Sequence, residues 1–123
     1  MTEARLSLGA WGEEQAVAYL IRQGLKIVAC NFTTPVGEID IIARSRRELV
    51  FVEVKTRRSQ AYGSPCEAVG PRKQRQILRT AQWYLADSKS PLQPRFDVIG
   101  VMPGDQGTAK IEHIQAAFGL PGA

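Results

Sequence analysis

Hydrophobic residues recur along the chain with two different periods, and these periods predict its secondary structure. Apolar residues three and four positions apart predict a helix over residues 7–23, which Gly24 ends. A second helix, over residues 71–87, begins at Pro71, a residue that the first helical position tolerates. Shorter apolar runs bounded by turn residues predict five strands, over residues 25–32, 38–44, 49–56, 96–102 and 108–114.

This order of elements, α-β-β-β-α-β-β, predicts an α/β fold in which helices flank a central mixed β-sheet. The 123 residues suit one domain, and no repeat or linker divides them, so we expect a single domain over residues 1–123. No apolar run is long enough for a membrane span, and the first residues lack the layout of a signal peptide. We therefore expect a cytoplasmic protein without membrane contact. Two cysteines and one histidine are too few for a structural zinc site.

Two of the predicted strands carry charged residues among Ile, Val and Phe. Asp40 lies in the run GEIDIIA, and Glu53 and Lys55 lie in the run FVEVK. Charges in buried strands are costly unless they are paired or hold a metal. Residues two apart on a strand share a face, so Glu53 and Lys55 point the same way. Regular alternation also groups Asp40 with Glu38 and Ile42, and a hairpin whose register sets Asp40 opposite the Glu53 region would bring the two carboxylates together.

Two carboxylates beside a lysine suit a magnesium site that cuts phosphodiester bonds. Magnesium takes oxygen ligands, usually one or two carboxylates together with waters or phosphate oxygens. The metal lowers the pKa of a bound water, and the lysine orients that water or neutralises charge on the phosphate. Spacing alone supports equally well a hairpin with a structural salt bridge, in which Lys55 pairs with Glu53 or Asp40.

Basic residues are concentrated around this hairpin. The net charge is +4, and residues 44–79 hold ten of the sixteen Lys and Arg residues but only three acids. Such a region is typical of proteins that bind a phosphate backbone, although an exposed charged surface gives the same pattern. The candidate nucleic-acid contacts are Arg57, Arg58, Tyr62, Lys73 and Arg75.

Spaced motifs that extend over nearly the whole chain give a more specific indication. They are Gly9-x-x-Gly12-Glu13-x-x-Ala16-x-x-Tyr19-Leu20, Gly24, Asn31, Gly37-Glu38-Ile39-Asp40, Phe51-Val52-Glu53-Val54-Lys55-x-Arg57, Tyr62-Gly63, Lys73, Arg95-Phe96-Asp97 and Glu112-His113. Together they resemble the YraN family, also designated UPF0102. Asp40 followed by Glu53-x-Lys55 resembles the signature of the restriction-endonuclease-like nucleases, which include the archaeal Holliday-junction resolvases. The resemblance implies a restriction-endonuclease-like fold.

The resemblance to the resolvases also implies a role for each charged position. Asp40 and Glu53 match the two central metal ligands, and Glu13 matches the N-terminal acid that completes the metal site. The Val54 carbonyl matches a further oxygen ligand, and Lys55 matches the catalytic lysine. The cofactor implied is Mg²⁺ or Mn²⁺, and the partner implied is DNA. Resolvases act on a junction with two symmetric cuts, which makes a homodimer plausible.

Two positions need separate comment. Ile39 stands where the wider superfamily has a proline, but that proline carries no chemistry. Glu14 follows Glu13 on the first helix, and since the two point in different directions, only one of them faces the site well. The sequence leaves open which one does.

The sequence therefore predicts a metal-dependent endonuclease that hydrolyses DNA phosphodiester bonds, with branched or otherwise structured DNA as the candidate substrate. The alternative is a non-catalytic nucleic-acid-binding or adaptor module on a nuclease fold. Outside the hairpin, Trp83 is expected to pack within the protein, with base stacking as the less favoured interpretation. His113 is expected to make a structural hydrogen bond, and Arg95 and Asp97 to belong to a strand edge.

Overall fold

The computed structural model describes residues 2–59 and 63–119, which form two helices, five strands and two short 3₁₀ turns. The 3₁₀ turns are η2 (Cys66–Ala68) and η3 (Asp105–Gly107). The helices are α1 (Thr2–Arg22) and α2 (Pro71–Ser88). The strands are β1 (Lys26–Thr34), β2 (Gly37–Arg44), β3 (Glu48–Thr56), β4 (Gln93–Pro103) and β5 (Ala109–Phe118).

The strands form one mixed sheet in the order β1-β2-β3-β4-β5. Three of the four strand pairs are antiparallel, whereas β3 and β4 run parallel because α2 crosses between them. This confirms the predicted α/β class and the order α-β-β-β-α-β-β, and it is consistent with a restriction-endonuclease-like fold.

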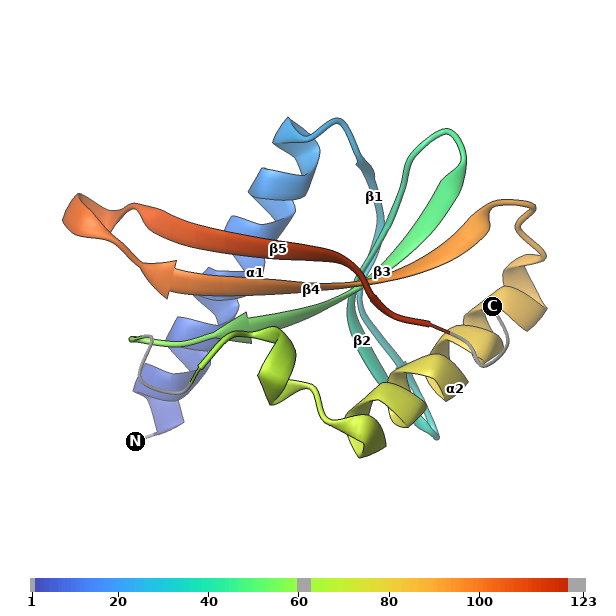
Figure 1. Cartoon of the computed structure of the whole chain (residues 1–123), viewed down its shortest axis with the longest axis horizontal. Coiled ribbons are helices and arrows are strands. Elements are labelled where there is room, and N and C mark those ends of the chain that lie inside the picture. Colours follow the sequence, from blue (N-terminus) through green and yellow to red (C-terminus); the bar gives the residue numbers. More distant parts are fainter. Residues whose placement is uncertain (1, 60–62, 120–123) are drawn as a thin grey trace.

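The two helices cover opposite faces of this twisted sheet (Figure 1). Ala16 and Leu20 of α1 pack on one face, and Ile77 and Ala81 of α2 pack on the other. Strand β3 contributes to both cores, which explains why its sequence is an almost continuous apolar run. Glu53, which lies in the buried part of β3, is therefore in the middle of the molecule.

Several elements are longer than predicted. Helix α1 begins five residues earlier, at Thr2, because the residues before position 7 include no helix breaker. Strand β4 begins three residues earlier, where the amide of Gln93 donates to the carbonyl of Arg47. Strand β5 continues to Phe118 through a bulge in which Ala116 has a φ of 49°. The bulge interrupts the alternation that predicts strands, so the sequence pattern ends too early.

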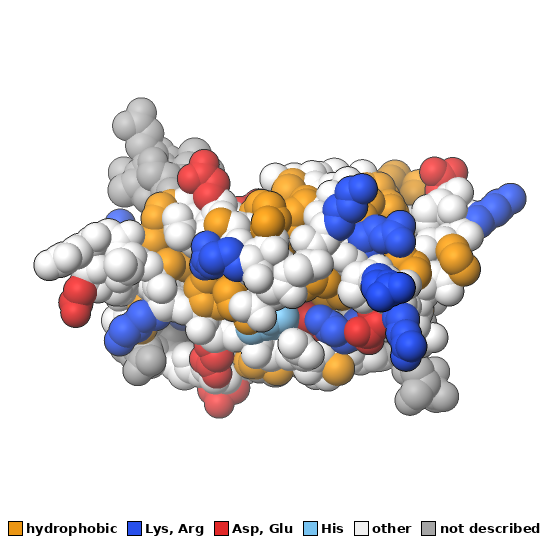
Figure 2. Space-filling view, turned by 90° about the horizontal axis from the view of Figure 1, so that it is seen from above, with side chains coloured by type: hydrophobic (Ala, Val, Ile, Leu, Met, Phe, Trp, Pro, Cys, Tyr) orange, Lys and Arg blue, Asp and Glu red, His pale blue; other side chains and the backbone are white. Residues whose placement is uncertain are grey.

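Basic side chains lie on more than one part of the surface. In Figure 2, the Lys and Arg side chains gather toward one end of the face shown. Arg46 lies in the turn between β2 and β3, at the opposite end of these strands from Asp40 and Lys55. The basic run of the sequence is therefore divided in space. No helix within the described ranges is long and apolar enough to cross a membrane.

Candidate active site

Strands β2 and β3 separate at Asp40. The last residue pair of their ladder is Ile41 with Val52, and beyond it the amide of Val54 donates to Asp40 Oδ2 at 2.8 Å. The side-chain alternation of β2 also breaks here, since Ile39 belongs to the core under α2 and Ile41 to the core under α1. The alternation expected across Glu38, Asp40 and Ile42 is therefore interrupted between Ile39 and Ile41, so these three side chains do not all share one face. The Asp40 carboxylate takes the place of a main-chain partner in the gap.

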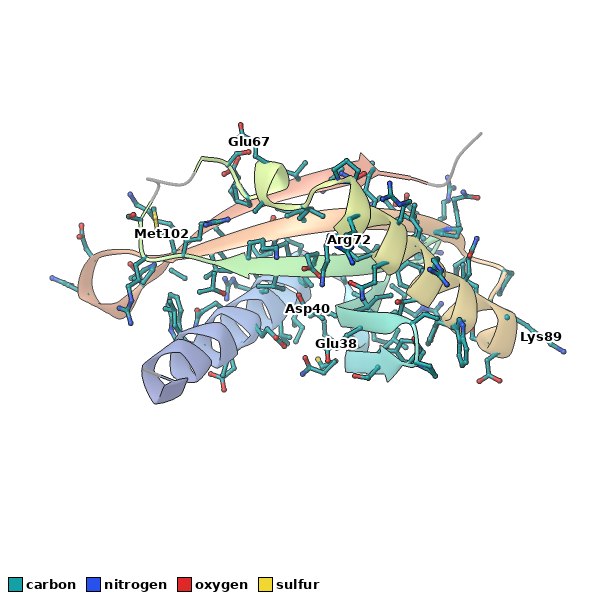
Figure 3. All side chains as sticks on the ribbon, turned by 90° about the horizontal axis from the view of Figure 1, so that it is seen from below. Glu38, Asp40, Glu67, Arg72, Lys89 and Met102 are labelled. Atoms are coloured by element: carbon teal, nitrogen blue, oxygen red, sulfur yellow. The ribbon has the colours of Figure 1, made fainter. Side chains whose placement is uncertain are left out.

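The four predicted catalytic side chains, which come from three different elements, line one pocket. Its lining residues are Leu8, Gly9, Glu13, Asp40, Glu53, Val54, Lys55 and Thr56. In Figure 3, Asp40 lies in the region between α1 and α2. Helix α1 thus supplies one acid, β2 the second, and β3 the third acid with the lysine.

A glycine lets α1 come close enough to contribute its acid. A Cβ at Gly12 would meet Thr56, whose Cβ and Cγ2 both lie 2.8 Å from that position. Any larger residue would therefore push α1 away from the end of β3. Because Glu13 follows Gly12 directly, this close approach places the carboxylate in the pocket.

Glu13, rather than Glu14, faces the pocket. Glu14 is exposed and does not line it. Burial raises the pKa of Glu13 above its ordinary value, and the charges of Glu38 and Glu53 raise it further, whereas a side-chain hydrogen bond from Asn31 lowers it. Asn31, for which the sequence indicated no role beyond its place in the family motif, thus holds the acid of α1. Its φ of 54° lies in the left-handed region, which asparagine tolerates better than most residues.

Asp40 and Glu53 interact strongly. Burial raises the pKa of Asp40 from 3.8 to about 7, and the neighbouring charge and hydrogen bond of Glu53 act in the same direction, as does the charge of Glu13. The hydrogen bond from the Val54 amide opposes this shift. The two carboxyl groups therefore share a hydrogen bond. A cation that replaced the shared proton would stabilise the site, because it would offset the repulsion between the two carboxylates.

Two lysines contact Glu53, which is only 5% exposed. Lys55 Nζ lies 3.3 Å from Glu53 Oε2. Of the two salt bridges that the sequence allowed for Lys55, the one with Glu53 is therefore formed. Lys73 Nζ, from the first turn of α2, lies 3.6 Å from the same oxygen. Lys73 was predicted as a phosphate contact only. Its contact with a buried acid depends on how α2 docks on the sheet, which no local pattern reveals.

The donor set fits an open magnesium site rather than a closed metal cage. Within residues 2–59 and 63–119, no group of three or more His, Cys, Asp or Glu residues is close enough to hold a metal ion by itself. Magnesium commonly uses only one or two protein carboxylates and keeps several waters. The hydrogen-bonded Asp40–Glu53 pair meets that requirement. Glu13 influences the pair through its charge and lines the same pocket.

The remaining predicted nucleic-acid contacts lie at different places around this pocket. Arg57 lines a separate cavity of about 150 Å³ that it shares with Lys55. Arg58 is exposed, and Arg75 lines a groove along α2. Tyr62 lies outside the described residues.

A second buried polar cluster lies away from the pocket. Asp97 is fully buried and receives a bidentate hydrogen bond from Arg95, at 2.9 and 2.8 Å. His113 Nε2 lies 2.7 Å from Asp97 Oδ2, and His113 Nδ1 lies 3.0 Å from the Tyr19 hydroxyl. The structural hydrogen bond predicted for His113 is thus confirmed. The assignment of Arg95 and Asp97 to a strand edge is wrong, because β4 lies inside the sheet.

Comparison with known proteins agrees with the motifs. Residues 12–101 match the family described as Uncharacterised protein family UPF0102. A UPF0102 protein of Syntrophotalea carbinolica is 60% identical over 124 residues, which cover 99% of each chain. UPF0102 proteins of Desulfosudis oleivorans and Geotalea daltonii are 44% and 49% identical, over 96% and 93% of this chain and 94% and 91% of their own. The chain therefore belongs to the UPF0102 family, as its motifs indicated.

Proposed function

We propose that this protein is a metal-dependent endonuclease that hydrolyses phosphodiester bonds of DNA, with branched or otherwise structured DNA as its substrate. The observation that carries the proposal is the pocket in which Glu13, Asp40, Glu53 and Lys55 meet. Two buried carboxyl groups that share a hydrogen bond destabilise each other when both are charged. Such an arrangement is expected where a divalent cation binds.

Each residue has a task in this chemistry. Asp40 and Glu53 would hold Mg²⁺ or Mn²⁺, with Glu13 and the Val54 carbonyl in support. The bound metal would lower the pKa of a water and offset the negative charge of the phosphate. Lys55 lines the same pocket, where its ammonium group can orient the attacking water and stabilise charge on the phosphoryl oxygens. As the water forms its bond to phosphorus, the bond from phosphorus to the 3′ oxygen would break, and that oxygen would take up a proton from solvent. A homodimer would suit a substrate with two symmetric cuts.

The second candidate is a non-catalytic nucleic-acid-binding or adaptor module. One observation favours it. Lys55 and Lys73 both form salt bridges with Glu53, which gives these charged side chains a purely structural role. The pair of acids argues against it, since carboxylates that face a phosphate weaken binding unless a cation lies between them.

Cleavage assays with labelled DNA distinguish the two candidates. Linear duplex, single-stranded, flapped and four-way-junction DNA would be incubated with Mg²⁺ or Mn²⁺. We expect cleavage by the wild type and a loss of about 100-fold or more in Asp40→Asn, Glu53→Gln and Lys55→Met. Glu14→Gln is the matched control, because that acid lies outside the pocket, and it should cut normally. DNA binding without cleavage of any substrate would favour the binding module.

A further inference from the structure

The exposed side of α2 carries a groove with an unusually uniform charge. The groove is lined by Val36, Gly70, Arg72, Lys73, Arg75, Gln76 and Arg79, so that four cations and no acid face it among the residues that the structure describes. Packing against β2 fixes one wall. A Cβ at Gly37 would lie 2.7 Å from both Gln76 Cγ and Thr80 Oγ1, and this close approach holds the neighbouring Val36 against the helix. A groove of this charge suits a chain of phosphates.

The groove begins at the acid pocket. Lys73 lines the groove, and its ammonium group lies 3.6 Å from Glu53 of the pocket. Figure 3 shows Arg72 at the start of α2, on the side of the molecule from which Asp40 is seen. A nucleic-acid strand with one phosphate in the pocket would therefore meet the cations of α2 next.

The groove continues to an exposed tryptophan. A second hollow shares Val36 and Arg79 with it and contains Trp83, which is 51% exposed, and one acid, Asp87. Trp83 lies four residues after Arg79, so the two side chains are neighbours on one helix face. The packing that was predicted for Trp83 is thus wrong, and a large aromatic surface stands at the end of a basic path.

The length of this path suits a short stretch of nucleic acid. From Lys73 to Trp83 the helix rises about 15 Å, which corresponds to about four nucleotides of a stacked strand. A tryptophan on a helix surface cannot stack on a base inside a duplex, because the adjacent base pairs cover both faces of that base. It can stack on an unpaired base, and such stacking is tolerant of sequence.

We propose that α2 guides an unpaired strand of the substrate away from the acid pocket, with its phosphates along Arg72, Lys73, Arg75 and Arg79 and one base stacked on Trp83. The inference rests on the proposed nucleic-acid substrate and narrows it to DNA with a single-stranded segment beside the cut, such as an overhang or a flap.

Binding measured without cleavage tests this inference separately from the nuclease chemistry. Fluorescence anisotropy in EDTA would compare a short oligothymidine, a duplex with an overhang and a blunt duplex. We expect the unpaired strand to bind about tenfold more tightly than the blunt duplex. Trp83→Ala should remove that preference, and Trp83→Phe should retain most of it. Because Trp83 is half exposed, neither change creates a cavity in the core.

The basic residues are tested by salt dependence. Arg75→Gln with Arg79→Gln should reduce the slope of log affinity against log salt by about 0.7 for each single-strand phosphate that is no longer neutralised. Arg44→Gln with Arg46→Gln removes the same charge at the far end of the β2–β3 hairpin, and it should change the slope less.

The possible results have distinct meanings. Strand binding that depends on Trp83, without any cleavage in metal, would support the inference and contradict the nuclease. Cleavage with equal affinity for blunt duplex and single strand, or binding unchanged in Trp83→Ala, would overturn the inference and leave the nuclease standing. Loss of self-association in Trp83→Ala, seen by sedimentation, would overturn it as well, because this face would then join copies of the chain.

Discussion

At the scale of single residues, the chemistry depends on a break in regular sheet structure. Asp40 stands where β2 leaves its ladder with β3, and the Val54 amide holds its carboxylate beside Glu53. A regular strand would have paired that amide with a carbonyl and turned the carboxylate elsewhere. Local irregularity thus makes room for a functional carboxylate at the cost of a main-chain hydrogen bond, which the side chain replaces.

The raised pKa of Asp40 predicts how the stability of the metal-free protein depends on pH. The carboxyl group has a pKa of about 7 in the folded protein and an ordinary value of 3.8. Between these values the folded state holds a proton that the unfolded state has lost, so the contribution of Asp40 to stability is greatest below about pH 4 and is lost as the pH rises through 7.

The difference in unfolding free energy between wild type and Asp40→Asn isolates this contribution. We expect that difference to change by up to about 1.4 kcal/mol for each pH unit within the window, with the wild type relatively weaker at high pH. Urea denaturation in EDTA at several pH values measures it. A difference that does not vary with pH would contradict the proposed interaction of the two acids.

Divalent metal should reverse this loss of stability. Mn²⁺ at about 100 times its dissociation constant is expected to stabilise the wild type by about 2.7 kcal/mol, because only the folded protein brings the acids together. Thermal unfolding with and without Mn²⁺ measures the effect. The stabilisation should disappear in Asp40→Asn and persist in Glu14→Gln, whose side chain lies outside the pocket. If Mn²⁺ stabilised Asp40→Asn as much as Glu14→Gln, the metal would bind outside this pocket.

At the scale of elements, close packing of α1 on β3 completes the site. Gly12 is buried against Thr56 and so sets the position of Glu13. Gly9, one turn earlier in the same helix, has open space where a Cβ would be. The two glycines therefore have different physical roles, although both belong to the same sequence motif.

Matched alanine substitutions separate these roles. Gly12→Ala should destabilise the protein by about 1–3 kcal/mol, because the methyl group overlaps Thr56 and forces α1 outward. Gly9→Ala should be neutral or slightly stabilising, since alanine favours the helix. Chemical denaturation measures both variants. Partial recovery in Gly12→Ala with Thr56→Ala would confirm the contact, and equal effects of the two single changes would contradict it.

At the scale of the whole molecule, one buried polar network connects four elements. Asp97 on β4 binds Arg95 of the same strand, His113 of β5 and, through that imidazole, Tyr19 of α1. Arg95 also pairs with Glu48 of β3 at 2.8 Å. The amide of Ala116 donates to Asp97 Oδ1 at 3.1 Å, so the same carboxylate supports the bulge of β5. The network is fully paired around Asp97 and therefore has a structural role.

Removal of its central charge should weaken the whole fold. Asp97→Ala leaves Arg95 without its bidentate partner, and we expect a loss of about 3–5 kcal/mol in unfolding free energy. Asp105→Ala is the control, because that aspartate is exposed in η3 and should change stability by less than about 0.5 kcal/mol. Urea denaturation of both variants measures the difference. A cost below about 1 kcal/mol for Asp97→Ala would show that the network contributes little.

The sequence by itself determined the order of elements, the mixed sheet and the acids that it carries. Periodicity of apolar residues is local, and it indicates correctly which segments are helix or strand. Only the tertiary structure decided that Glu13 faces the pocket, that Lys73 reaches Glu53 and that Trp83 stays exposed. These outcomes depend on how closely each helix approaches the sheet and on which side of the helix faces it. Such contacts join residues far apart in the chain, and a local pattern carries no information about them.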